Sequence, residues 1–110
     1  MRRVILPRFV ILEHDYPDQY WDFLLEAGDH LRAWKLRESP EKLTNGENIE
    51  AEIAPNHRLI YLDYEGPISN GRGAVKRFDQ GLFKWLEEND GKVTVEISGK
   101  KVIGTFKLPA

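Results

Sequence analysis

The chain has 110 residues, of which 41% are hydrophobic and 31% are charged, with a formal net charge of −2. A chain of this size can bury one core, so residues 1–110 are expected to form a single domain. The charge excludes a global attraction to a phosphate backbone, since dedicated nucleic-acid binders usually carry a basic excess. The absence of cysteine excludes disulfides, thiolate metal sites and a cysteine nucleophile.

The start of the chain, residues 1–7, is basic and then apolar. This apolar run is too short for a signal peptide, and it lacks a small-residue cleavage site. No stretch of the sequence is long and apolar enough for a transmembrane helix. The simplest expectation is a cytoplasmic protein that does not enter a membrane.

Short apolar segments separated by turn signals such as Asn45-Gly46 and Asn89-Asp90-Gly91 run through the whole chain. They predict strands at residues 8–13, 20–27, 30–36, 49–54, 59–64, 74–78, 82–87, 92–98 and 101–108. Short strands at this spacing predict an all-β fold, either a barrel or a sandwich. Residues 83–89 also fit one or two helical turns, and the polar residues 37–48 are the best candidate for a mobile loop.

Alternation along residues 20–27 assigns side chains to the two faces of a strand. Trp21, Phe23 and Leu25 share one face, which we expect to be the core, and Asp22 and Leu24 share the other. A carboxylate flanked by two aromatic residues must find water, a hydrogen-bond donor or a metal ion.

His14 ends the first apolar strand, and Asp22 lies inside the next one. Imidazole and carboxylate are ligands for divalent first-row metals, so this pair is a workable start to a metal site. The alternative is that His14 is simply hydrogen-bonded at the end of its strand.

Several sequence blocks resemble one known family. Residues 8–15 (RFVILEHD) and 20–26 (YWDFLLE) are similar to the opening motif of the 3'-phosphoesterase domain of bacterial DNA ligase D, R-F-V-x-x-x-H-D-x-x-x-x-H-Y-D-F-R-L-E. Residues 57–68 (HRLIYLDYEGPI) resemble its block H-P-x-x-Y-x-x-F-E-G-x-I. Weaker similarities at residues 31–34, 71–74 and 99–106 stand in the same order. The resemblance implies a single small β-barrel of this type, with room for one short helix.

The resemblance also implies a site. His14 and Asp22 match metal-binding positions, and Tyr20 stands in place of the expected second histidine. His57 and Tyr61 match the catalytic pair at the phosphate; four residues apart on a strand, they would point to the same side. The implied cofactor is Mn²⁺ or another divalent metal ion, weakly bound because a neutral phenol is a poor ligand at pH 7.

Three positions where the family places a cation carry Leu24, Glu38 and Ile49 instead. These losses remove contacts that would hold a phosphate. Other basic residues are available for substrate binding at Arg72, Lys76 and Arg77, although Gly71-Arg72-Gly73 is explained better by a hairpin turn than by a phosphate-binding loop.

Two functions from different classes follow from the resemblance. The first is a divergent, metal-dependent hydrolase that processes DNA or RNA 3' ends in DNA repair, in the context of non-homologous end joining. The second is a catalytically silent β-barrel that binds a nucleic-acid end, a DNA-repair protein or a small anion. The retained residues favour the first function, and the missing cations favour the second.

Overall fold

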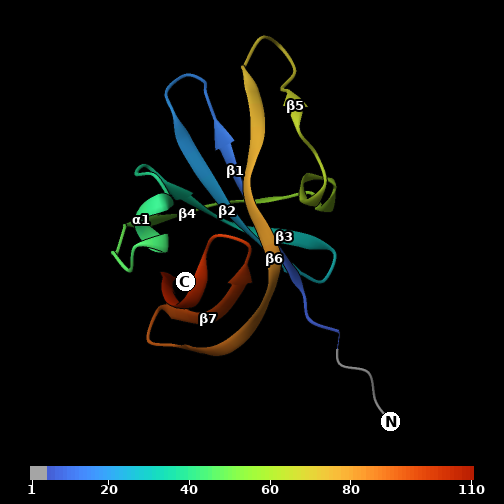
Figure 1. The fold of residues 1–110 in the computed structure, drawn as a ribbon. Helices are drawn as coiled ribbons and strands as arrows, with labels where there is room; N and C mark the ends of the chain where they lie inside the picture. Colours follow the sequence, from blue (N-terminus) through green and yellow to red (C-terminus); the bar gives the residue numbers. More distant parts are fainter. Residues whose placement is uncertain (1–4) are drawn as a thin grey trace.

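The computed structural model describes residues 5–110, so residues 1–4 of the basic and apolar start lie outside the described part of the chain. The strands are β1 (Arg8–His14), β2 (Tyr20–Ala27), β3 (His30–Leu36), β4 (Ala51–His57), β5 (Gly66–Pro67), β6 (Ala74–Asn89), β7 (Lys92–Gly99) and β8 (Ile103–Pro109). They form one antiparallel sheet in the order β4-β3-β2-β1-β6-β7-β8, with β5 paired to β6. The sheet curls into a half-barrel (Figure 1), which confirms the predicted all-β, barrel-like class.

Apolar side chains cover both faces of the central strands. The larger cluster contains the predicted core residues Trp21, Phe23 and Leu25, together with Leu43 and residues of β7 and β8. The smaller cluster lies on the other face and includes Val10, Leu12, Leu24, Leu62 and Val75. A strand buried on both faces loses the simple alternation of apolar and polar residues.

The two ends of the curled sheet approach each other near the C-terminus. The indole N–H of Trp34 on β3 donates a hydrogen bond of 2.7 Å to the backbone carbonyl of Pro109 on β8. This contact joins residues that are 75 positions apart, and it satisfies the polar atom of a side chain that is only 2% exposed.

The predicted strand at residues 59–64 is wrong. This segment contains a short 3-10 helix, η1 (Leu59–Leu62), and the chain here crosses from the edge strand β4 toward β5. Leu62 is buried in the smaller cluster, with Leu59, Tyr61 and Tyr64 packed against it. The apolar pattern correctly indicated burial, but it could not show that no neighbouring strand was available for pairing.

The predicted break at Asp79-Gln80-Gly81 is also wrong, as is the alternative helical turn at residues 83–89. Both lie within one 16-residue strand, β6. A register shift opposite Ile11 and Leu12 marks a bulge beside Asp79, so residues that suggested a turn instead bend a continuous strand.

The 37–48 segment, predicted as a loop, contains the one-turn helix α1 (Glu41–Thr44), which places Leu43 in the larger cluster. The fourth strand starts later than predicted, at Ala51, and ends on His57. Within residues 5–110, neither helix has the length and apolar character needed to cross a bilayer.

The buried carboxylate of Asp79, 3% exposed, fastens the β7–β8 turn to β6. It accepts backbone N–H hydrogen bonds from Gln80 (2.8 Å), Lys100 (3.0 Å), Lys101 (3.1 Å) and Val102 (2.8 Å). Without the carboxylate, these N–H groups would lose their partner in a largely buried place, which is costly.

We therefore expect Asp79→Ala to lower the free energy of unfolding by about 3 kcal/mol, the usual cost of breaking a buried hydrogen-bond network. Urea denaturation followed by circular dichroism measures this change. Asp18→Ala, at an exposed position, is the matched control and should change stability by less than about 0.5 kcal/mol. Equal midpoints for the two variants would contradict the assigned role of Asp79.

Candidate functional site

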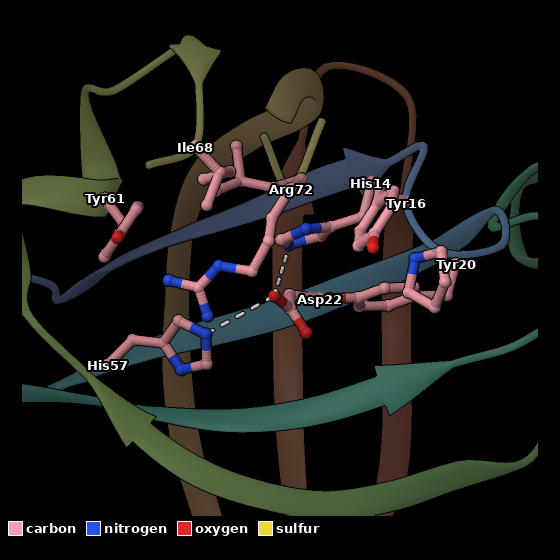
Figure 2. A pocket seen from close by; sticks show the side chains of 10 residues that line it. His14, Tyr16, Tyr20, Asp22, His57, Tyr61, Ile68 and Arg72 are labelled. Atoms are coloured by element: carbon pink, nitrogen blue, oxygen red, sulfur yellow. Dashed lines mark hydrogen bonds and ion pairs between the residues drawn. The ribbon is translucent and has the colours of Figure 1, made fainter. Parts of the chain in front are cut away.

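A pocket of about 320 Å³ opens on the face of the sheet that carries the smaller apolar cluster (Figure 2). It is lined by Leu12, His14, Tyr16, Pro17, Tyr20, Asp22, His57, Tyr61, Ile68 and Arg72. The pocket thus gathers six of the residues singled out from the sequence, His14, Tyr20, Asp22, His57, Tyr61 and Arg72. For the first five, this convergence was expected from the family resemblance.

The register of β1 and β2 explains why these side chains meet. Asp22 lies opposite Leu12, and Tyr20 lies opposite His14, so all four point to the same face. Further along the same face, Val10 and Leu24 are fully buried. The polar groups therefore stand at the ends of two strands, beside an apolar floor.

Asp22 is the centre of the site. Its side-chain oxygen Oδ2 lies 2.6 Å from Nε2 of His14 and 3.4 Å from Nε2 of His57 (Figure 2), and the residue is only 4% exposed. Burial alone would raise the pKa of Asp22, but the hydrogen bonds and charges of the two histidines outweigh it and hold that pKa below its ordinary value. Asp22 is therefore a buried carboxylate anion at neutral pH.

His57 lies between two acceptors. Its Nε2 faces Asp22, and its Nδ1 lies 2.9 Å from the backbone carbonyl of Pro55, which can only accept a hydrogen bond. The hydrogen bond to Asp22 raises the pKa of His57 above its ordinary value, although burial opposes this. Both neighbours are acceptors, so a proton on either ring nitrogen of His57 has a hydrogen-bond partner in this geometry.

The ring of Tyr20 is held by two neighbours. Its ring stacks on that of His14, with centroids 4.4 Å apart and planes inclined by 6°, and the Lys35 ammonium lies 4.2 Å from the ring centroid. Burial, helped by the charge of Asp22, raises the pKa of the Tyr20 phenol. The phenol is therefore neutral at pH 7.

The residues present fit a divalent metal only in part. His14 and Asp22 offer nitrogen and oxygen donors of the type that Mn²⁺ accepts. However, the Nε2 atoms of His14 and His57 both face the same Asp22 oxygen. The position of the second metal-binding histidine that the family resemblance implies is occupied by Tyr20, which is stacked on His14. Within residues 5–110, no group of three His, Cys, Asp or Glu side chains is arranged to hold an ion.

Tyr61 reaches the pocket by a different route from the one predicted. His57 is the last residue of β4 and Tyr61 belongs to η1, so the two do not share the face of one strand. The turn of η1 still brings them together, with ring centroids 5.7 Å apart in an edge-to-face arrangement.

Arg72 lies at the tip of the β5–β6 hairpin, which the sequence correctly predicted as a turn. Figure 2 shows its side chain reaching over the pocket toward His57 and Asp22. The hairpin is anchored by Asp15, whose carboxylate accepts the backbone N–H of Ala74 at 2.9 Å. Gly73, at φ +74°, leaves room for that carboxylate, since a Cβ there would lie 2.2 Å from Asp15 Oδ1.

Lys76 and Arg77 do not line this pocket. They line a separate one of about 330 Å³ with Glu13 and Trp21, and Arg77 pairs with Glu65 at 3.4 Å. Tyr16, Pro17 and Ile68 complete the site, and sequence reasoning missed them. The first two follow His14 in the β1–β2 connection, so proximity to a candidate ligand was the available signal.

The three positions that lack the expected cations lie in ordinary structural surroundings. Leu24 is fully buried in the smaller cluster, and Ile49 packs against the larger one. Glu38 pairs with Lys42 at 2.6 Å. None of these three positions supplies a cation to the pocket, whose lining includes one arginine, Arg72.

We expect His57 to titrate above its ordinary pKa of 6.5. The substitution Asp22→Asn should lower the pKa of His57, because it removes the negatively charged partner. Histidine ring NMR signals followed over pH report this directly in metal-free buffer. Asp29→Asn, which alters the carboxylate beside His30, is the matched control and should leave His57 unchanged. An unchanged His57 pKa in Asp22→Asn would contradict the pairing.

The same pair sets the pH dependence of stability. The contribution of His57 is fully present below pH 6.5 and is lost as the pH rises through its raised folded-state pKa. The contribution of Asp22 is present above 3.8 and is lost as the pH falls through its lowered folded-state pKa. Urea midpoints across this range should therefore respond less to pH in Asp22→Asn than in the unmodified chain.

Comparison with known proteins identifies a family. The family model of the DNA ligase D 3'-phosphoesterase domain matches residues 12–109. The multifunctional non-homologous end joining protein LigD of Pseudomonas aeruginosa is 26% identical over 111 residues, which cover 94% of this chain and 13% of that protein. The matched range begins at Leu12 near the end of β1 and includes β2, the η1 segment and the β5–β6 hairpin. The chain belongs to the DNA ligase D 3'-phosphoesterase domain family.

Proposed function

We propose that this chain is a divergent family member that recognises phosphorylated 3' ends of DNA or RNA during DNA repair. The observation that carries the proposal is the convergence of His14, Asp22, His57, Tyr61 and Arg72 on one pocket. Family membership supports the substrate class, since the matching domain is described as a 3'-phosphoesterase.

The pocket has the groups needed to hold a terminal phosphate. Arg72 can donate in parallel to two phosphate oxygens, and the protonated form of His57 supplies a second positive donor. The Tyr61 hydroxyl offers a neutral donor from η1. Asp22 lies behind both histidines and fixes their orientation, which is the usual task of a carboxylate that backs an imidazole.

Hydrolysis requires more than binding. The transferring phosphoryl group carries negative charge on its non-bridging oxygens, and catalysis depends on preorganised cations around them. Here Leu24 is buried among apolar side chains and Tyr20 is stacked on His14. These two observations favour binding of a nucleic-acid end, with turnover far below that of a family member that has all the expected metal ligands and cations. The second candidate function is therefore a catalytically silent β-barrel that only binds the end.

The cellular context comes from the curated relative, whose name places it in non-homologous end joining. The chain spans 13% of the length of that protein. Under the proposal, this chain meets other DNA-repair proteins at a broken end in the cytoplasm.

The first test compares matched oligonucleotides that end in a 3'-phosphate or a 3'-hydroxyl, by fluorescence anisotropy at fixed salt. We expect the phosphate end to bind about tenfold more tightly, and Arg72→Gln to remove most of that preference, because each charge-assisted contact is worth about 1.5 kcal/mol. Lys92→Gln, at an exposed position of β7, is the matched control. Equal affinity for both ends would overturn the proposed function.

The second test measures phosphate release from a 3'-phosphorylated primer-template. We expect a rate at least about 10²-fold below that of a complete family member, the usual cost of one lost transition-state contact. Tyr20→His with Leu24→Arg should recover part of the rate. However, the arginine should also lower the urea midpoint, because position 24 is fully buried. Robust turnover by the unmodified chain, abolished by His57→Ala, would contradict the expected loss.

The third test concerns the metal. We propose that Mn²⁺ binds weakly through His14 and Asp22, and we expect tighter binding in Tyr20→His, because an imidazole replaces a neutral phenol in the third position. Isothermal titration calorimetry measures both affinities. Tyr20→Phe is the matched control and should show no gain. Tight binding by the unmodified chain without improvement in Tyr20→His would contradict the expectation.

A further inference from the structure

A second pocket of about 310 Å³ adjoins the first. It is lined by Arg58, Ile60, Tyr61, Tyr64, Pro67, Ile68, Ser69 and Arg72. Tyr61, Ile68 and Arg72 line both pockets, so the two are separated only by side chains that they share. A ligand that fills the first pocket can therefore extend into the second across Arg72.

The second pocket contains the arginines that have no acidic partner. Of the six arginines within residues 5–110, Arg8, Arg32, Arg37 and Arg77 each lie within 4.0 Å of a carboxylate. Arg58 and Arg72 have no such neighbour in the described part of the chain, both are exposed, and both line this pocket. No aspartate or glutamate lines it.

The nearby acidic residues are neutralised elsewhere. Asp63 pairs with Arg8 at 2.7 Å, and Glu65 pairs with Arg77 at 3.4 Å. Both lie in the segment that forms the pocket wall, yet their charges are compensated by β1 and β6. The positive charge of Arg58 and Arg72 therefore faces solvent with little opposing charge, in a chain whose net charge is −2.

The second pocket also presents aromatic surface. Tyr61 and Tyr64 meet edge to face, with ring centroids 5.9 Å apart, and the Tyr64 hydroxyl donates a hydrogen bond to the Pro67 carbonyl. Ile60 beside them is 60% exposed. Cations that follow a backbone, together with aromatic rings, are the usual elements of single-strand recognition.

We propose that the second pocket binds the nucleotide immediately 5' of the terminal phosphate, with the 3' end in single-stranded form. Arg58 contacts the internucleotide phosphate, Arg72 lies between that phosphate and the terminal one, and the base packs against Tyr64 and Ile60. This inference rests on the proposed function for the position of the terminal phosphate. A duplex end would have to unpair its last base pair to use the pocket, so the preferred substrate is a 3' overhang.

The test uses Arg58→Gln, because Arg58 lines only the second pocket. Two probes are compared by equilibrium titration: a nucleoside 3'-monophosphate, which lacks the internucleotide phosphate assigned to Arg58, and a single-stranded hexanucleotide with a 3'-phosphate. We expect the variant to bind the hexanucleotide about five- to tenfold more weakly, with a salt slope smaller by about 0.7, while affinity for the mononucleotide is unchanged. Lys92→Gln also removes one positive charge and should change the affinity for neither probe.

The outcomes separate this inference from the proposed function. Equal losses for both probes, or no loss for either, would overturn the second pocket as a nucleotide site while leaving 3'-phosphate binding intact. If oligonucleotides with phosphate and hydroxyl ends bind equally but Arg58→Gln still weakens binding of the hexanucleotide, the second pocket is supported as a nucleotide site and the proposed function fails. A blunt duplex that binds as tightly as the overhang, or an acidic phosphopeptide that competes equally well, would also overturn the inference. Unchanged circular dichroism of Arg58→Gln verifies its fold.

Discussion

The site depends on one buried carboxylate. An anion that is 4% exposed is unfavourable unless donors surround it, and Asp22 finds its donors in His14 and His57. These two histidines come from β1 and from the end of β4, at opposite sides of β2 and β3 in the sheet. The charge of Asp22 therefore ties the edge of the sheet to its centre and orients both imidazoles at the mouth of the pocket.

The sheet could not make this pocket by itself. The chain leaves β4, crosses the face of the sheet through η1, and returns to β6 through the β5–β6 hairpin. Leu62 anchors the crossing in the smaller apolar cluster, and Asp15 anchors the hairpin through Ala74. As a result, the strands supply the rigid floor and the histidine–aspartate group, while the crossing segment supplies Arg58 and Tyr61 and the hairpin supplies Arg72.

Much of this arrangement could be predicted from the sequence. The bounds of β2 and β3 were predicted to the residue, because both strands alternate clearly and end at turn residues. The convergence of His14, Tyr20 and Asp22 followed from alternation and hairpin pairing. His57 and Tyr61 were connected to them only through the family resemblance.

The errors share one physical origin. Residues 59–64 and Asp79-Gln80-Gly81 were misjudged because local pattern does not reveal which backbone groups have partners from distant parts of the chain. Asp79 suggests a turn by its residue type, yet its carboxylate binds N–H groups more than twenty positions away. Likewise, Arg77 looks like a substrate contact until Glu65 is seen beside it. Ion pairing between distant segments decides which basic residues stay available for a ligand.

The distribution of charge around the pocket also explains why binding and hydrolysis should separate. A cation on β2 would be held rigidly, whereas position 24 now belongs to the apolar floor. The remaining arginines lie on the crossing segment and the hairpin tip, where Arg72 is exposed and held only by a hydrogen bond to the Ser69 carbonyl. Such side chains can adapt to a bound phosphate, so they support affinity. Transition-state stabilisation needs charges fixed in advance, whereas the groups that Asp22 holds in place in this pocket are the two imidazoles of His14 and His57.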